Sequence, residues 1–102
     1  MDASTAASEM LWAGSKFIGA DCAGPNKAFY MCKQSSADPS ACLSQGQAVT
    51  RCAGTALATL SGSCSAGFQA YRQCLEGNRR QFSACRDVQE QLQKCYDEAK
   101  KL

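Results

Sequence analysis

Eight cysteines carry most of the chemistry available to this chain of 102 residues. They fall into four pairs, and nine residues separate the two cysteines of every pair: Cys22 and Cys32, Cys42 and Cys52, Cys64 and Cys74, and Cys85 and Cys95. Thiols in proteins form disulfides, hold soft metal ions or act as nucleophiles. The uniform spacing indicates a covalent framework rather than a reactive site.

The remaining residues favour neither metal binding nor catalysis by these cysteines. Structural zinc sites take thiolates roughly two to four residues apart, and copper delivery favours near-adjacent soft ligands, so neither metal suits this spacing. The chain contains no histidine, the commonest acid–base group of enzymes, and its eight glycines are scattered rather than gathered in a phosphate-binding loop. The sequence therefore predicts no enzyme, no cofactor and no metal site.

The charges and the apolar residues exclude other classes. The net charge is +2, and the basic residues of the second half are mixed with acidic ones, which is typical of a solvated helix surface and not of a nucleic-acid interface. No apolar run approaches the roughly 18 residues of a transmembrane helix.

The cysteine pattern is a duplication. Cys22 and Cys64 lie 42 positions apart, Cys42 and Cys85 lie 43 apart, and an aromatic residue, Phe29 or Tyr71, precedes the second cysteine of each unit by three positions. Two units of about 40 residues follow, each near the size at which disulfides are usually needed. We expect an extension over 1–21, a first hairpin over 22–60 and a second over 61–102.

Residues that typically begin or end helices predict four helices and no strand, and hence an all-α fold. The expected helices run from near Pro25 to Ser35, from Asp38-Pro39 to Ser61, from Cys64 to Glu76 before Gly77-Asn78, and from Arg79–Phe82 to the C-terminus. Ten residues of helix rise about 15 Å, so two cysteines of one pair cannot bond each other. Of the 105 possible connectivities, antiparallel hairpins favour the nested one: Cys22–Cys52, Cys32–Cys42, Cys64–Cys95 and Cys74–Cys85.

Residues 1–21 lie outside the repeat and are apolar in places. They contain Met10, Leu11, Trp12, Phe17 and Ile18. A helix and a disordered tail both remain open, since Gly14-Ser15 weakens a helix. We expect the segment to become ordered on a partner, with Trp12 as its anchor. It resembles neither a secretory signal nor an arginine-rich presequence, and Met1 argues against a removed signal. Paired cysteines without such a leader indicate the mitochondrial intermembrane space.

Several segments resemble a known family. Tandem C-x9-C hairpins are similar to the coiled-coil-helix-coiled-coil-helix (CHCH) family of the intermembrane space, and four such motifs resemble the quadruple C-x9-C accessory subunits of respiratory complex I, in the short form of plants and algae. The matching segments are Ser15-Lys16-Phe17-Ile18-Gly19-Ala20-Asp21-Cys22, Asn26-Lys27-Ala28-Phe29, Asp38-Pro39-Ser40-Ala41-Cys42-Leu43 and Val49-Thr50-Arg51-Cys52.

The resemblance implies a nonenzymatic scaffold, without a cofactor, needed for the assembly and stability of complex I. It would be peripheral to the inner membrane, on the intermembrane-space side of the membrane arm, with membrane-arm and accessory subunits as partners. It also implies import through the intermembrane-space thiol oxidase, which would meet apolar residues beside a cysteine. The expected partner and import patch is Trp12, Phe17, Ile18, Phe29 and Tyr71. A soluble assembly factor or redox or metal chaperone is the alternative.

Overall fold

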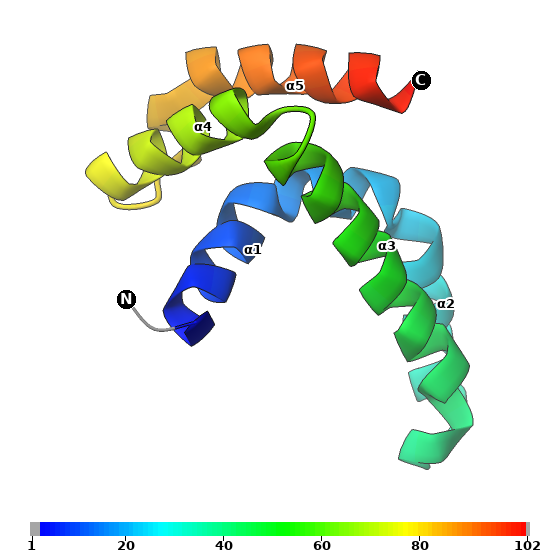
Figure 1. The fold of residues 1–102 in the computed structure, drawn as a ribbon. Helices are drawn as coiled ribbons and strands as arrows, with labels where there is room; N and C mark the ends of the chain where they lie inside the picture. Colours follow the sequence, from blue (N-terminus) through cyan, green and yellow to red (C-terminus); the bar gives the residue numbers. More distant parts are fainter. Residues whose placement is uncertain (1–2, 102) are drawn as a thin grey trace. The chain divides into compact units, whose positions relative to one another are not determined.

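The computed structural model describes residues 3–101, with the side chains described from Glu9 onward. All of its regular structure is helical, so the predicted all-α class is confirmed for these residues (Figure 1). In chain order the elements are α1 (Ala3–Asp21), α2 (Ala23–Ser35), η1 (Pro39–Cys42), α3 (Leu43–Ser61), α4 (Ser65–Gly77), η2 (Phe82–Cys85) and α5 (Arg86–Lys100), where η marks a short 3-10 helix. Each repeat thus contains a helix, a 3-10 turn and a second helix.

The chain divides into two compact units. One unit is Ser15–Ala56, and it holds α2, η1 and most of α3. The other joins the chain up to Gly14 with Leu57–Leu102, so the first part of α1 belongs with the second hairpin. These units cut across the extension that the sequence predicts over residues 1–21.

Helix α1 corrects one expectation. Gly14-Ser15 does not interrupt it, since α1 runs unbroken from Ala3 to Asp21. Gly14 is buried there, and Ala13 is only 1% exposed. A glycine inside a helix costs roughly 1 kcal/mol relative to alanine, an amount that burial of neighbouring side chains readily offsets.

The start of the second half of each hairpin is a 3-10 turn. In the first hairpin Asp38 caps this turn, because its Oδ1 accepts a hydrogen bond from the backbone N–H of Ser40 at 3.0 Å, and Pro39 occupies the first position. The hydrogen bonds from Ser40 also lower the pKa of the Asp38 carboxyl. The predicted restart at Asp38-Pro39 is therefore confirmed, although α3 itself begins only at Leu43. Helix α2 begins at Ala23, two residues before the predicted Pro25.

The end of α4 depends on two arginines rather than on a glycine in a left-handed conformation. Gly77 is the last helical residue, and the positive φ angles belong to Arg79 at 55° and Arg80 at 62°. The N–H of Arg80 then donates to the carbonyl of Leu75 at 2.7 Å. This left-handed step reverses the chain toward η2 and is uncommon for residues other than glycine.

The second hairpin has a core made from one face of each helix. Its buried members recur at intervals of three and four residues, which places them on one side of a helix. They are Phe68, Tyr71 and Leu75 of α4 with Gln89, Leu92 and Tyr96 of α5. Gln89 is the buried polar member, and its Nε2 donates to the Tyr71 hydroxyl at 2.9 Å. Burial raises the pKa of Tyr71, so the hydroxyl stays neutral at physiological pH.

We expect Tyr71→Phe to lower the free energy of unfolding by about 1–2 kcal/mol, because the amide of Gln89 would lose a partner while staying buried. Urea unfolding monitored by circular dichroism measures the change. The double variant Tyr71→Phe/Gln89→Leu replaces both polar partners and should recover most of the loss. A double variant less stable than Tyr71→Phe alone would contradict this account of the core.

Candidate functional site

Four disulfides connect the helix pairs. They are Cys22–Cys52 and Cys32–Cys42 in the first hairpin, and Cys64–Cys95 and Cys74–Cys85 in the second. The Cα atoms of the bonded residues lie between 5.8 and 6.0 Å apart, within the range usual for disulfides. The inner bridge of each hairpin lies at the 3-10 turn and the outer bridge at the opposite end. Two covalent bridges thus hold α2 and α4 near both of their ends, while α3 continues beyond Cys52 to Ser61.

This framework limits the chemistry of the chain. All eight cysteines are bonded, so none offers a thiolate for catalysis or metal binding. Within the part of the chain that the structure describes, no group of three potential metal ligands comes together. None of the described helices is long and apolar enough to cross a membrane.

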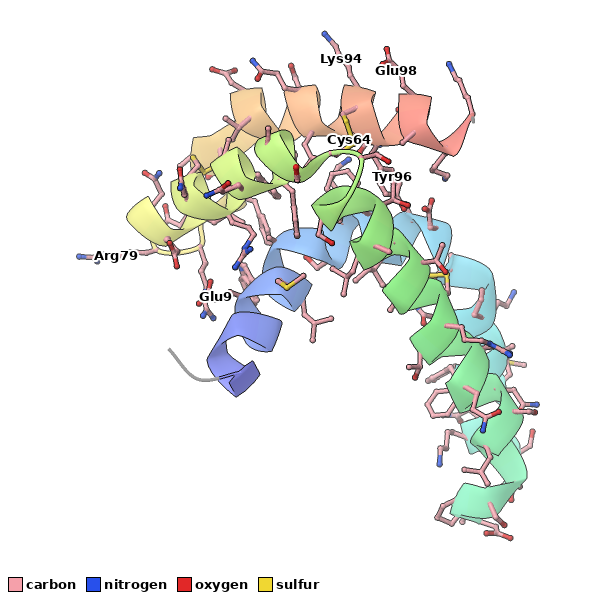
Figure 2. The ribbon with its side chains drawn as sticks, in the orientation of Figure 1. Glu9, Cys64, Arg79, Lys94, Tyr96 and Glu98 are labelled. Carbon is pink, nitrogen blue, oxygen red and sulfur yellow. A yellow bond between two sulfur atoms is a disulfide. The ribbon has the colours of Figure 1, made fainter. Side chains whose placement is uncertain are left out.

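Trp12 of the expected partner patch contacts its own chain. Its ring stacks on that of Phe82, with centroids 5.6 Å apart and planes 11° apart. The guanidinium of Arg80 lies 5.4 Å from the Trp12 ring and forms an ion pair with Glu9. Figure 2 marks Glu9 on α1 of this unit. Trp12 nevertheless remains 41% exposed.

The other members of the patch differ in how accessible they are. Phe17 is 2% exposed and Tyr71 is fully buried, whereas Ile18 and Phe29 are half-buried. Trp12 and Tyr71 belong to one compact unit, and Phe17, Ile18 and Phe29 belong to the other. Once the chain has folded, Phe17 and Tyr71 are too buried for a partner to reach. A role for them in import would therefore precede folding.

An apolar groove of about 800 Å³ lies on the first hairpin and includes one predicted residue, Phe29. Its walls come from α2, η1 and α3, and its lining is Phe29, Lys33, Pro39, Cys42, Leu43, Gly46, Gln47, Val49, Thr50 and Arg51. Gly46 lets the Phe29 ring approach the backbone of α3, because a Cβ there would stand 3.2 Å from that ring. Leu43 is 61% exposed at the groove.

Sequence reasoning missed this groove and the contact of α1 with η2. An alignment of the two repeats would have indicated the groove, since the positions of Gln89 and Leu75 in the second hairpin hold Gly46 and Lys33 in the first. The stacking of Trp12 on Phe82 had no such signal, because seventy positions separate the two residues.

Comparison with known proteins agrees with this architecture. The family model described as "CHCH-CHCH-like Cx9C, IMS import disulfide relay-system" matches residues 57–99, which include α4, η2 and all of α5 except its last residue. The chain belongs to the CHCH family of C-x9-C proteins. The predicted family is thereby confirmed.

One curated relative covers most of this CHCH chain. The NADH-ubiquinone oxidoreductase 20.8 kDa subunit of Neurospora crassa is 37% identical over 92 residues. The matched region is 88% of this chain and 50% of the relative, so the chain spans about half the length of that protein.

We expect the two bridges of one hairpin to contribute different amounts to the free energy of unfolding. Cys22–Cys52 closes a sequence separation of 30 residues and Cys32–Cys42 one of 10. By the chain-entropy relation, replacing both cysteines of the outer bridge with serine should cost about 3.6 kcal/mol, and replacing those of the inner bridge about 2.7 kcal/mol. Urea unfolding of the oxidised variants, each checked by mass for three intact disulfides, gives the two values. An inner bridge that contributes more than the outer one would contradict the loop-length argument.

We expect Trp12→Ala to lower the free energy of unfolding of the unit that contains α4 and α5 by about 1–2 kcal/mol, because it removes both the aromatic stack and the contact with Arg80. Leu11→Ala is the matched control, since Leu11 is 50% exposed on the same helix and should change stability by less than about 0.5 kcal/mol. A double-mutant cycle with Phe82→Ala should show coupling of about 0.5–1.5 kcal/mol. Additive effects would mean that the stack does not stabilise the fold.

Proposed function

We propose that this chain is a nonenzymatic accessory subunit of mitochondrial NADH:ubiquinone oxidoreductase, complex I. The observation that carries the proposal is the 37% identity to the Neurospora crassa 20.8 kDa subunit over 88% of the chain. The disulfide framework supports it, since two covalently bridged hairpins expose stiff surfaces and stiffness lowers the ordering cost of permanent association. The role is to support the assembly and stability of the complex.

The place of action follows from the same features. Structural disulfides form and persist mainly in oxidising compartments, and the matching family model names the import relay of the intermembrane space. The chain is imported by oxidation through the thiol oxidase of that space and lies peripherally on the inner membrane. Its partners are the membrane-arm and accessory subunits of complex I. Before folding, Phe29 and Tyr71 present an aromatic surface beside Cys32 and Cys74. Afterwards the exposed part of the Trp12 side chain and, on the other unit, Ile18 each contact a neighbouring subunit.

A redox or metal chaperone is the second candidate. Such a protein needs a cysteine pair that opens during its work, and here the bridges are part of the hairpins themselves: Cys22, Cys42, Cys64 and Cys85 are each at most 2% exposed. Opening a bridge takes two electrons and two protons from a reductant and leaves two thiols, so a cycle of opening and closing would remove the bonds that hold the helix pairs together. The scaffold role is therefore favoured over a cycling role.

We expect cells that lack the chain to lose assembled complex I, and a tagged wild-type copy to restore it and to migrate with the complex on a native gel. The measurement is in-gel NADH dehydrogenase activity together with detection of the tag. Complex IV on the same gel serves as the control for general respiratory damage. Full amounts of complex I without the chain, or a tag that migrates only as a free protein, would overturn the proposal and favour the soluble alternative.

A further inference from the structure

The first and second hairpins differ at the same positions of the repeat. The six core residues of the second hairpin are all buried, whereas the residues at the matching places of the first, 42 positions earlier on α2 and 43 earlier on α3, are all exposed or half-buried. The pairs are Phe68 and Asn26, Tyr71 and Phe29, Leu75 and Lys33, Gln89 and Gly46, Leu92 and Val49, and Tyr96 and Ala53. Four of the first-hairpin residues, Phe29, Lys33, Gly46 and Val49, line the groove. Smaller or polar residues have thus opened a face that the second hairpin keeps closed.

The second hairpin also shows what covers the 3-10 turn. Its 3-10 turn begins with Phe82, which stands at the position of the groove residue Pro39. Phe82 is covered by Trp12, and α1 up to Gly14 packs in the same compact unit as α4 and α5. The 3-10 turn of the second hairpin is therefore covered by a helix that places an aromatic side chain on it.

Charge accompanies this contact. In the second hairpin the covering helix supplies the acid, Glu9, and the turn supplies the base, Arg80. In the first hairpin the groove has two bases and no acid among its lining residues, namely Lys33 and Arg51. The Nζ atom of Lys33 stands 5.5 Å from the centre of the Phe29 ring, so the cation is held over the apolar floor. A covering segment for this groove should therefore carry carboxylates beside its apolar residues.

We propose that the groove of the first hairpin binds an acidic amphipathic helix of another subunit, in the way that the second hairpin binds α1. Apolar side chains at helical spacing would enter the groove against Phe29, Leu43 and Val49, as in other helix-in-groove contacts. Carboxylates on the same helix would meet Lys33 and Arg51, which gives orientation and specificity. The inference rests on the proposed function, because it names the chemistry of the partner within complex I.

The charge requirement is tested by reversing it. In cells that lack the endogenous chain, Lys33→Glu/Arg51→Glu should reduce the fraction of the protein that migrates with complex I by roughly tenfold relative to wild type, since like charges would then face the partner. Both side chains are exposed, so the oxidised fold should be retained, as a non-reducing gel and protease resistance of the unassembled pool can establish.

Two single variants serve as matched controls. Lys27→Glu makes the same change on α2 outside the groove lining. Lys94→Glu makes it on α5, at the position that matches Arg51, where Figure 2 shows the side chain projecting away from α4. Both should assemble like wild type. A double groove variant that assembles as well as these controls would overturn the proposal.

The occupant is identified by cross-linking, which changes the groove little. A benzophenone amino acid in place of Leu43, which is 61% exposed, should form an adduct in the intact complex. The adduct expected by mass spectrometry is a helix of another complex I subunit with aspartate or glutamate beside apolar residues three and four positions apart. An adduct with lipid, with a second copy of this chain or with its own α1, or the absence of an adduct, would overturn the inference.

Failure of this inference is distinguishable from failure of the proposed function. If the wild-type chain migrates with complex I but the groove variants do so equally well, the scaffold role stands and the groove is not the docking site. If the wild-type chain itself never migrates with the complex, the proposed function fails first.

Discussion

Covalent closure of each helix pair is the constraint on which the rest of this structure depends. Helix α2 shows this most plainly, because none of its thirteen residues is buried. A helix of that length is marginal in water when it stands alone, and α2 has little apolar packing to compensate. The bridges Cys22–Cys52 and Cys32–Cys42 keep it against α3 at both ends. Reduction should therefore dissolve the first hairpin more readily than the second.

The two repeats share the same disulfide pattern but differ in how their helices are packed. In the second hairpin Tyr71, Leu75 and Leu92 are buried, and α1 up to Gly14 belongs to the same compact unit. The first hairpin lacks that packing, and its two disulfides hold the helices together. A surface held open in this way can remain apolar without collapsing, because the bridges rather than burial determine the distance between its helices.

Oxidation therefore connects folding, location and function in one step. A chain with reduced cysteines lacks the stabilisation that disulfides supply to small domains, and it gains this only where thiols are oxidised. Once the bridges close, the surfaces become rigid and their ordering is complete before any partner arrives. A permanent structural subunit benefits from this order of events, since association then costs little further conformational entropy.

The sequence by itself determined the helical repeats and the nested pairing of the cysteines that they allow. Both follow from local geometry: ten residues along a helix exclude a bridge within one pair, and Asp38-Pro39 is a helix start whatever surrounds it. Only the tertiary structure decided that α1 continues through Gly14, that Arg79 and Arg80 take the left-handed conformation, and that the face around Phe29 is open while that around Tyr71 is closed. These outcomes depend on contacts between residues far apart in sequence, such as Trp12 with Phe82, and the energy of such a contact exists only after the chain has brought the two rings together.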